Sequence, residues 1–97
     1  MDKSSRYRIE SVFQAGQVLR VVAESKTVMG SSEIAAVLGI TVNTAFRMCA
    51  TLEELGFLKQ VGEKFELGMG LALFWARKKA SLEGERMVIE RDITELG

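Results

Sequence analysis

The stretch LGITVNTAFRMCATLEELGFL, residues 38–58, decides the fold. Gly39 ends an apolar helical pattern, as a glycine in the left-handed conformation commonly does. Thr41 can cap a new helix through its hydroxyl oxygen. We expect this helix over about residues 42–55, ended by Gly56. Its inward positions are spaced three and four apart. They are Ala45, Met48, Cys49, Leu52 and Leu55.

A short helix is expected immediately before this stretch. Gly30 is a permissible N-cap, and Glu33 lies in the first turn, where a negative charge suits the helix dipole. Ile34, Ala35 and Leu38 form its apolar face. The two patterns joined at Gly39 therefore predict two helices connected by a tight turn.

An earlier helix is expected over about residues 11–24. Ser11 and Gln14 fit a capping box, and apolar side chains then recur at helical spacing. The segment that follows is expected to be a connector with one short β bridge at Thr27–Met29. The inward positions of the helix are Val12, Ala15, Val18, Leu19 and Val22.

The apolar period changes to two after Gly56. FLKQV and KFEL flank Gly62-Glu63, which reads as the loop of a small β-hairpin. Four apolar side chains should lie on or near the core, and four polar ones should face water or a partner. The apolar ones are Leu58, Val61, Phe65 and Leu67, and the polar ones are Lys59, Gln60, Lys64 and Glu66.

The order of three helices and a hairpin predicts a mainly α fold with a small β-hairpin, namely a winged helix-turn-helix domain over residues 1–68. Residues 69–97 read as one or more further helices. Their apolar stripe contains Leu71, Phe74 and Trp75, and nothing in the chain is left to cover it. We expect Trp75 to be a core residue or a dimer anchor, and we expect residues 69–97 to pair with a second copy in a homodimer.

Composition narrows the classes of function. The chain has no histidine and one cysteine, which excludes a catalytic triad and a Cys/His-rich metal site, so we expect neither an enzyme nor a cofactor. The formal net charge is zero, but residues 1–79 hold 11 basic and 8 acidic side chains. This distribution permits nucleic-acid binding without requiring it. The chain lacks a signal-peptide pattern and a membrane span, which predicts a cytoplasmic location.

The second helix of a helix-turn-helix pair reads base edges in the major groove through its N-terminal part. Asn suits adenine there and Arg suits guanine, while basic side chains of the hairpin, with Arg6 or Arg8 of the N-terminal arm, can contact phosphates. Phe46 could instead pack against the wing. The predicted contacts to double-stranded DNA are Thr41, Val42, Asn43, Thr44, Phe46, Arg47, Lys59 and Lys64.

Three segments resemble one known family. SVFQAGQVLRVVAES, SSEIAAVLGITVNTAFRMCATLEELGFL and KFELGMGLAL are similar to the N-terminal DNA-binding domain of IclR-type transcriptional regulators, over residues 9–75. The resemblance implies a winged helix-turn-helix regulator. Gln14, Val42 and Phe46 depart from the residues usual in that family, so base preference is not carried over. The family's small-molecule domain has no counterpart in these 97 residues, so we expect no effector site here.

One alternative from another class stays open. Winged helices also serve as protein-interaction modules, and zero net charge with an acidic tail fits that role. Lys59 and Lys64 would then be ordinary solvated strand residues. The cluster Arg77–Lys79 would be either a solvated helical segment or a phosphate-binding patch. Salt dependence separates the two functions, because only contacts to phosphates make affinity fall steeply as salt rises.

Overall fold

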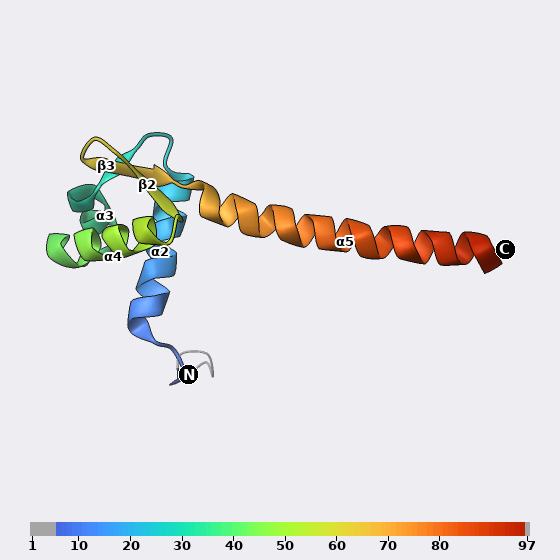
Figure 1. The fold of residues 1–97 in the computed structure, drawn as a ribbon. Coiled ribbons are helices and arrows are strands. Elements are labelled where there is room, and N and C mark those ends of the chain that lie inside the picture. Colours follow the sequence, from blue (N-terminus) through green and yellow to red (C-terminus); the bar gives the residue numbers. More distant parts are fainter. Residues whose placement is uncertain (1–5, 97) are drawn as a thin grey trace.

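The computed structural model describes the backbone of residues 6–96 and the side chains of residues 6–85. Three helices and a small antiparallel sheet form the body, and a long helix projects from it (Figure 1). The fold class predicted from the sequence is confirmed. The elements in chain order are α2 (Glu10–Glu24), β1 (Met29–Gly30), α3 (Ser31–Leu38), α4 (Val42–Glu54), β2 (Leu58–Val61), β3 (Lys64–Leu67) and α5 (Met69–Leu96).

Helix α2 begins one residue earlier than predicted. Its N-cap is Ile9, whose carbonyl accepts the first helical hydrogen bond from the Phe13 amide at 3.0 Å. The capping box predicted at Ser11 and Gln14 is therefore wrong, because Ser11 already lies inside the helix. Glu10 occupies the first turn, where its charge suits the positive end of the helix dipole.

The predicted two-stranded hairpin is part of a three-stranded sheet. Strand β1 pairs antiparallel with β3, with Met29 opposite Phe65, so the sheet order is β1-β3-β2. The bridge predicted at Thr27–Met29 exists but lies later, at Met29–Gly30. The hairpin loop is the predicted pair Gly62-Glu63, and Gly62 adopts a φ of 64°, which is a left-handed conformation that glycine adopts without steric cost.

Every helix and strand of the body contributes to one apolar core. The largest side chains that are essentially inaccessible to solvent are those of Phe65, Ile34, Leu58, Val18 and Cys49, and among the described residues no polar or charged side chain is buried. The free thiol of Cys49 is part of this core, as predicted, and desolvation raises its pKa to about 11. The buried residues are Val18, Val22, Met29, Ile34, Ala35, Ala45, Cys49, Leu52, Leu58 and Phe65.

Four apolar residues predicted to face inward are exposed instead. Val12 is 66% exposed because the first turn of α2 extends beyond the core, and Leu55 is 58% exposed at the end of α4. Val61 lies on the outer face with Lys59, since strand side chains alternate. Leu67 shares the face of Phe65 and lies opposite the buried Leu58, yet at the end of its strand it stays 42% exposed.

Three glycines fix the start of α5 against the end of α4. The Gly68 amide donates to the Phe57 carbonyl at 2.9 Å, and the Gly70 amide donates to the Gly56 carbonyl at 2.9 Å. A Cβ atom at Gly70 would lie 2.7 Å from the Gly56 oxygen, closer than atoms in proteins pack. The Phe57 and Phe74 rings also meet edge to face, with centroids 5.4 Å apart. We call the backbone contact made by Gly56, Gly68 and Gly70 the glycine joint.

Beyond the joint, α5 extends away from the body (Figure 1). The molecule measures 62 × 40 × 22 Å along its principal axes. Leu71 of the predicted apolar stripe is half-buried, but Phe74 is exposed and Trp75 is 64% exposed. The interpretation of Trp75 as a core residue is therefore wrong, and its side chain is available to a partner.

Candidate nucleic-acid interface

Helices α3 and α4 form a helix-turn-helix pair. Gly39 ends α3 with a φ of 68°, and the Ile40 amide donates to the Ala35 carbonyl at 3.1 Å. The two helices are bent by 114° across this break, within the range of about 90–120° that is typical of the motif. Ile34 and Ala35 of α3 and Ala45 and Cys49 of α4 belong to the shared core. The core therefore fixes α4 on the body.

The start of α4 is capped as predicted. The Thr44 amide donates to the Thr41 hydroxyl oxygen at 3.1 Å, and the Thr41 hydroxyl donates to the Thr44 hydroxyl oxygen at 2.8 Å. Thr41 thereby uses its only side-chain proton within the turn. Thr44, which is half-buried, keeps its own hydroxyl proton, the one a phosphate oxygen could accept.

The first two turns of α4 present the predicted side chains to solvent. Val42, Asn43, Phe46 and Arg47 are all exposed, because the inward positions of the helix are taken by Ala45 and Cys49. Phe46 is 52% exposed and is not among the side chains that pack against the core. The structure thus brings five of the predicted contacts, Thr41 included, to one free helix end.

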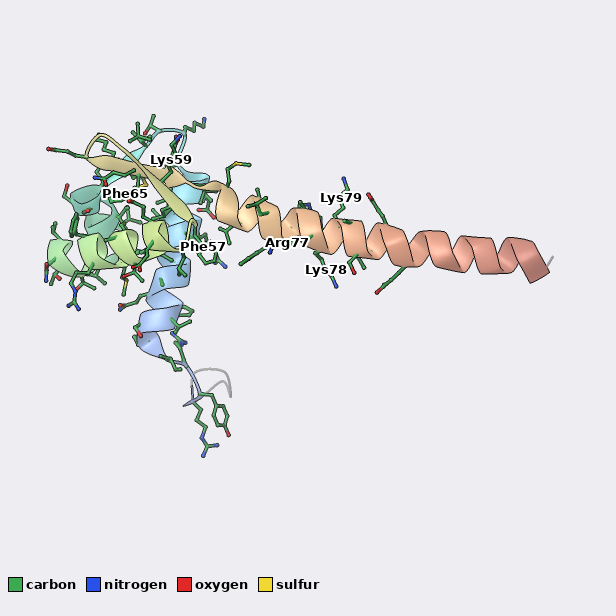
Figure 2. The ribbon with its side chains drawn as sticks, viewed as in Figure 1. Phe57, Lys59, Phe65, Arg77, Lys78 and Lys79 are labelled. Atoms are coloured by element: carbon green, nitrogen blue, oxygen red, sulfur yellow. The ribbon has the colours of Figure 1, made fainter. Side chains whose placement is uncertain are left out.

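The two lysines of the wing have different surroundings. Lys59 is exposed on β2 and pairs across the sheet with Glu66 of β3, and Figure 2 shows it on the wing. Lys64 forms an ion pair with Glu33 of α3, with Nζ and Oε1 3.3 Å apart. The sequence did not predict this pair, because the two residues are distant in the chain and meet only when β3 pairs with β1.

Glu33 links three elements through one carboxylate. It accepts a hydrogen bond from the amide of Gly30, the predicted N-cap of α3, at 3.2 Å, and it contacts Lys64. The Gly30 hydrogen bond first and Lys64 second hold the pKa of Glu33 below its ordinary value. A DNA phosphate near Lys64 would compete with this carboxylate, which reduces the expected contribution of Lys64.

Of the two arginines in the arm before α2, Arg8 already contacts side chains of that helix. The Arg8 guanidinium lies 4.1 Å from the centroid of the Phe13 ring and 4.0 Å from the Glu10 carboxylate. Arg8 is therefore held against α2. Arg6, the other arm residue predicted to contact a phosphate, is exposed.

A groove between α2 and α4 was missed by the sequence reasoning. It has a volume of about 490 Å³ and is mostly apolar. Val12 and Leu55, which were assigned to the core, lie on its walls, and Arg47 and Thr44 lie at the same groove. Their periodic spacing indicated burial but could not show that a groove opens between the two helices there. The lining residues are Ser11, Val12, Ala15, Thr44, Arg47, Met48, Thr51, Leu52 and Leu55.

Among the described residues, no group of three or more His, Cys, Asp or Glu side chains could hold a metal ion. No single described helix is long and apolar enough to cross a membrane, and α3 with α4 reach that length and composition only as a bent pair.

A helix-turn-helix pair with a three-stranded wing defines a winged helix-turn-helix domain. The family model of the IclR helix-turn-helix domain matches residues 11–62, which span α2 to the hairpin loop. The chain therefore belongs to the IclR helix-turn-helix family, as the resemblance implied. No curated protein matches the sequence.

Solved structures agree with this assignment. An IclR transcriptional regulator from Alicyclobacillus acidocaldarius is 31% identical, with a TM-score of 0.68, over 74% of this chain and 30% of that one. An IclR family transcriptional regulator from Brucella abortus is 26% identical, with a TM-score of 0.66, over 78% of this chain and 32% of that one. A putative IclR transcriptional regulator from a Silicibacter species is 26% identical, with a TM-score of 0.67, over 80% of this chain and 33% of that one. The chain thus matches about a third of the length of each.

Proposed function

We propose that this chain binds double-stranded DNA in a sequence-specific manner as part of a transcriptional regulator, with α4 in the major groove. The observation that carries the proposal is the free N-terminal end of α4. Asn43 and Arg47 lie exposed there on a helix that α3 braces through the core. A single α-helix fits the major groove of B-DNA, and its first turns are the part that reaches base edges.

Each proposed contact has a chemical role. Arg47 donates to the two acceptors of a guanine, and Asn43 pairs with the donor and acceptor of an adenine. Val42 and Phe46 offer apolar contact to thymine methyl groups. Thr44 donates to a phosphate, whereas Thr41 positions the helix and contributes its methyl group. Lys59 is the principal phosphate contact of the wing, and Lys64 is a weaker one because Glu33 already neutralises part of its charge.

We propose further that the regulator acts as a homodimer, with residues 1–68 as the DNA-binding unit and residues 69–97 as the pairing segment. The exposure of Phe74 and Trp75 on a projecting helix supports this division. Two copies would present two α4 helices to successive major grooves of a pseudo-palindrome. A cytoplasmic location suits such a regulator.

The α2–α4 groove favours one second candidate, a module that binds another protein. The groove is mostly apolar and open on the body, which suits an apolar helix or peptide. Zero formal net charge also fits this candidate. The two functions compete for the same surface, since Arg47 and Thr44 lie at both sites.

Titration of labelled random-sequence duplex at two salt concentrations, read by fluorescence anisotropy, tests the proposal. Binding through phosphates and bases releases counterions, so affinity should fall steeply between 50 and 200 mM salt, by about tenfold or more for a few phosphate contacts. Lys59→Ala should reduce the slope of log affinity against log salt by about 1. An absence of binding at low salt would reject DNA binding and leave the protein-interaction module.

A further inference from the structure

The ion pair between Lys64 and Glu33 joins the wing to the helix-turn-helix pair. Lys64 begins β3, whereas Glu33 lies in the first turn of α3. The two side chains meet because Lys64 pairs across the sheet with Gly30, the N-cap of α3. Lys64 Nζ and Glu33 Oε1 then lie 3.3 Å apart. The fold itself therefore places a carboxylate beside a lysine that was predicted to contact DNA.

Glu33 is held in place more firmly than Lys64. The Glu33 Oε1 atom that contacts Lys64 also accepts the hydrogen bond from the Gly30 amide at 3.2 Å. Among the described residues, no second carboxylate pairs with Lys64, and its ammonium group ends a flexible four-carbon stem. The side chain of Lys64 is 52% exposed, so its charge can reach solvent. Of the two partners, Lys64 is therefore the one that can exchange its contact.

The hairpin loop of the wing and the start of α4 lie at the same end of the body. Figure 1 shows this loop, which immediately precedes Lys64, and the first turn of α4 at the end away from α5. A duplex bound to α4 as proposed would bring phosphates toward that end. Phosphate contacts supply affinity and orientation without reading sequence. A DNA phosphate and the Glu33 carboxylate are therefore alternative partners for the same lysine.

We propose that Glu33 is a positioning residue that holds Lys64 away from DNA, so that a phosphate contacts Lys64 only by displacing the carboxylate. This proposal rests on the DNA binding proposed above and specifies which residue limits its strength. Glu33 acts in two ways, since it neutralises a cation of the wing and places a negative charge near the duplex. An exposed ion pair is weak, so a phosphate can displace it, and the expected change in affinity is a few-fold.

Glu33→Gln tests this role. Glutamine retains an oxygen that can accept the Gly30 amide, so the start of α3 keeps its cap while the charge is removed. Affinity for labelled duplex should rise about 2- to 5-fold at low salt. The slope of log affinity against log salt should steepen by up to about 1, because Lys64 then contacts a phosphate without competition. Fluorescence anisotropy measures both quantities. Unchanged or weaker binding by the Glu33→Gln chain would overturn the proposal.

Glu63→Gln is the matched control for charge. Glu63 is exposed in the hairpin loop next to Lys64, and among the described residues it pairs with no cation. Its replacement reduces the negative charge of the chain equally without releasing Lys64. We expect a smaller rise in affinity and an unchanged salt slope. Equal effects of Glu63→Gln and Glu33→Gln would mean that Glu33 acts through net charge alone, which would overturn its role in positioning Lys64.

A double-mutant cycle shows whether Glu33 acts through Lys64. Lys64→Gln should lower affinity by less than about twofold in the wild type, but by about 2- to 5-fold in the Glu33→Gln chain, where Lys64 has lost its partner. Lys59→Gln is the control, because Lys59 lies opposite Glu66 in the sheet and should lose the same affinity in both chains. Equal losses for Lys64→Gln in the two chains would overturn the proposal.

The wild type separates this proposal from the one on which it rests. An absence of duplex binding by the folded wild type at low salt would overturn DNA binding and the role of Glu33 together. Wild-type binding that Glu33→Gln does not strengthen would overturn only the role of Glu33. Circular dichroism of each variant, recorded under the titration conditions, shows that the chains being compared are folded.

Discussion

Thr41 shows how one side chain places the recognition surface. Its hydroxyl oxygen accepts the Thr44 amide, and this hydrogen bond sets the residue at which α4 begins. A start shifted by one residue would rotate every later side chain by about 100°, since the helix has 3.6 residues per turn. Asn43 and Arg47 would then leave the exposed face.

Replacing the cap should destabilise the domain. We expect Thr41→Ala to lower the free energy of unfolding by about 1 kcal/mol, because an amide at the helix start loses its partner. Thr41→Ser keeps the hydroxyl and serves as the control. Urea unfolding followed by circular dichroism measures both. Equal stability of the alanine and serine variants would show that the cap contributes nothing.

Glu33 makes stability depend on pH. Its pKa is lowered in the folded chain from an ordinary value of 4.5, by the Gly30 amide first and Lys64 second. A lowered folded pKa means that the stabilisation is complete above pH 4.5 and is lost as pH falls through the lower folded value. Glu33→Gln, which retains an oxygen acceptor, should therefore flatten the dependence of stability on pH below 4.5.

Urea unfolding at a series of acidic pH values checks this expectation. Lys64→Gln is the companion variant, and it should flatten the profile less because the larger cause, the Gly30 hydrogen bond, remains. If the wild type and Glu33→Gln lose stability in parallel below pH 4.5, the carboxylate does not link α3 to the wing as described.

The glycine joint determines how α5 is placed relative to α4. It brings the backbone of α5 against the turn that ends α4, so the direction in which α5 leaves the body depends on three residues without side chains. The Gly70 Cβ position would meet both the Gly56 carbonyl and the Phe57 ring, the latter at 2.9 Å. Any side chain there must separate the two elements.

Alanine substitutions at two helical glycines should have opposite effects. Gly70→Ala forces backbone apart at the joint and should destabilise the chain by about 1–3 kcal/mol. Gly16→Ala, within α2, meets no atom within 4 Å and should stabilise by about 0.5–1 kcal/mol because alanine favours the helix. Thermal unfolding of the two variants beside the wild type measures both. A neutral Gly70→Ala would contradict the tight joint.

Elements with a strong local signal were predictable from the sequence. Glycine at position 39, the Thr41 cap and the period of α4 are local features, and all three were confirmed. Strand β1 was misplaced because a two-residue strand carries almost no pattern. Val61 was assigned to the core from its hydrophobicity, although the alternation of the strand places it outside with Lys59. The Lys64–Glu33 ion pair and the α2–α4 groove depend on contacts between distant segments.

The candidate DNA contacts, too, could be predicted only in part from the sequence. Exposure of Val42, Asn43, Phe46 and Arg47 followed from knowing which face of α4 is buried, and the structure shows that exposure. Their pairing with particular bases stays a prediction, because the sequence and the fold specify a surface and not an operator.

In the whole molecule, we expect the body to bind DNA and the projecting helix α5 to pair with a second copy. Figure 1 shows α4 on the body and α5 extending away from it, so the proposed pairing through α5 would leave the N-terminal end of α4 free. Asn43 and Arg47 would remain available in each copy, and the dimer would supply two reading helices.

Selection of duplexes from a random-sequence library, followed by titration at two salt concentrations, tests whether α4 reads DNA sequence. We expect enrichment of a motif with two-fold symmetry. Arg47→Ala should lose roughly 5- to 150-fold in affinity for it, the cost of one bidentate base contact, while the control Arg20→Ala, an exposed arginine of α2, should bind as the wild type does. No enriched motif, with the same weak and salt-sensitive binding in all three proteins, would contradict DNA reading by α4.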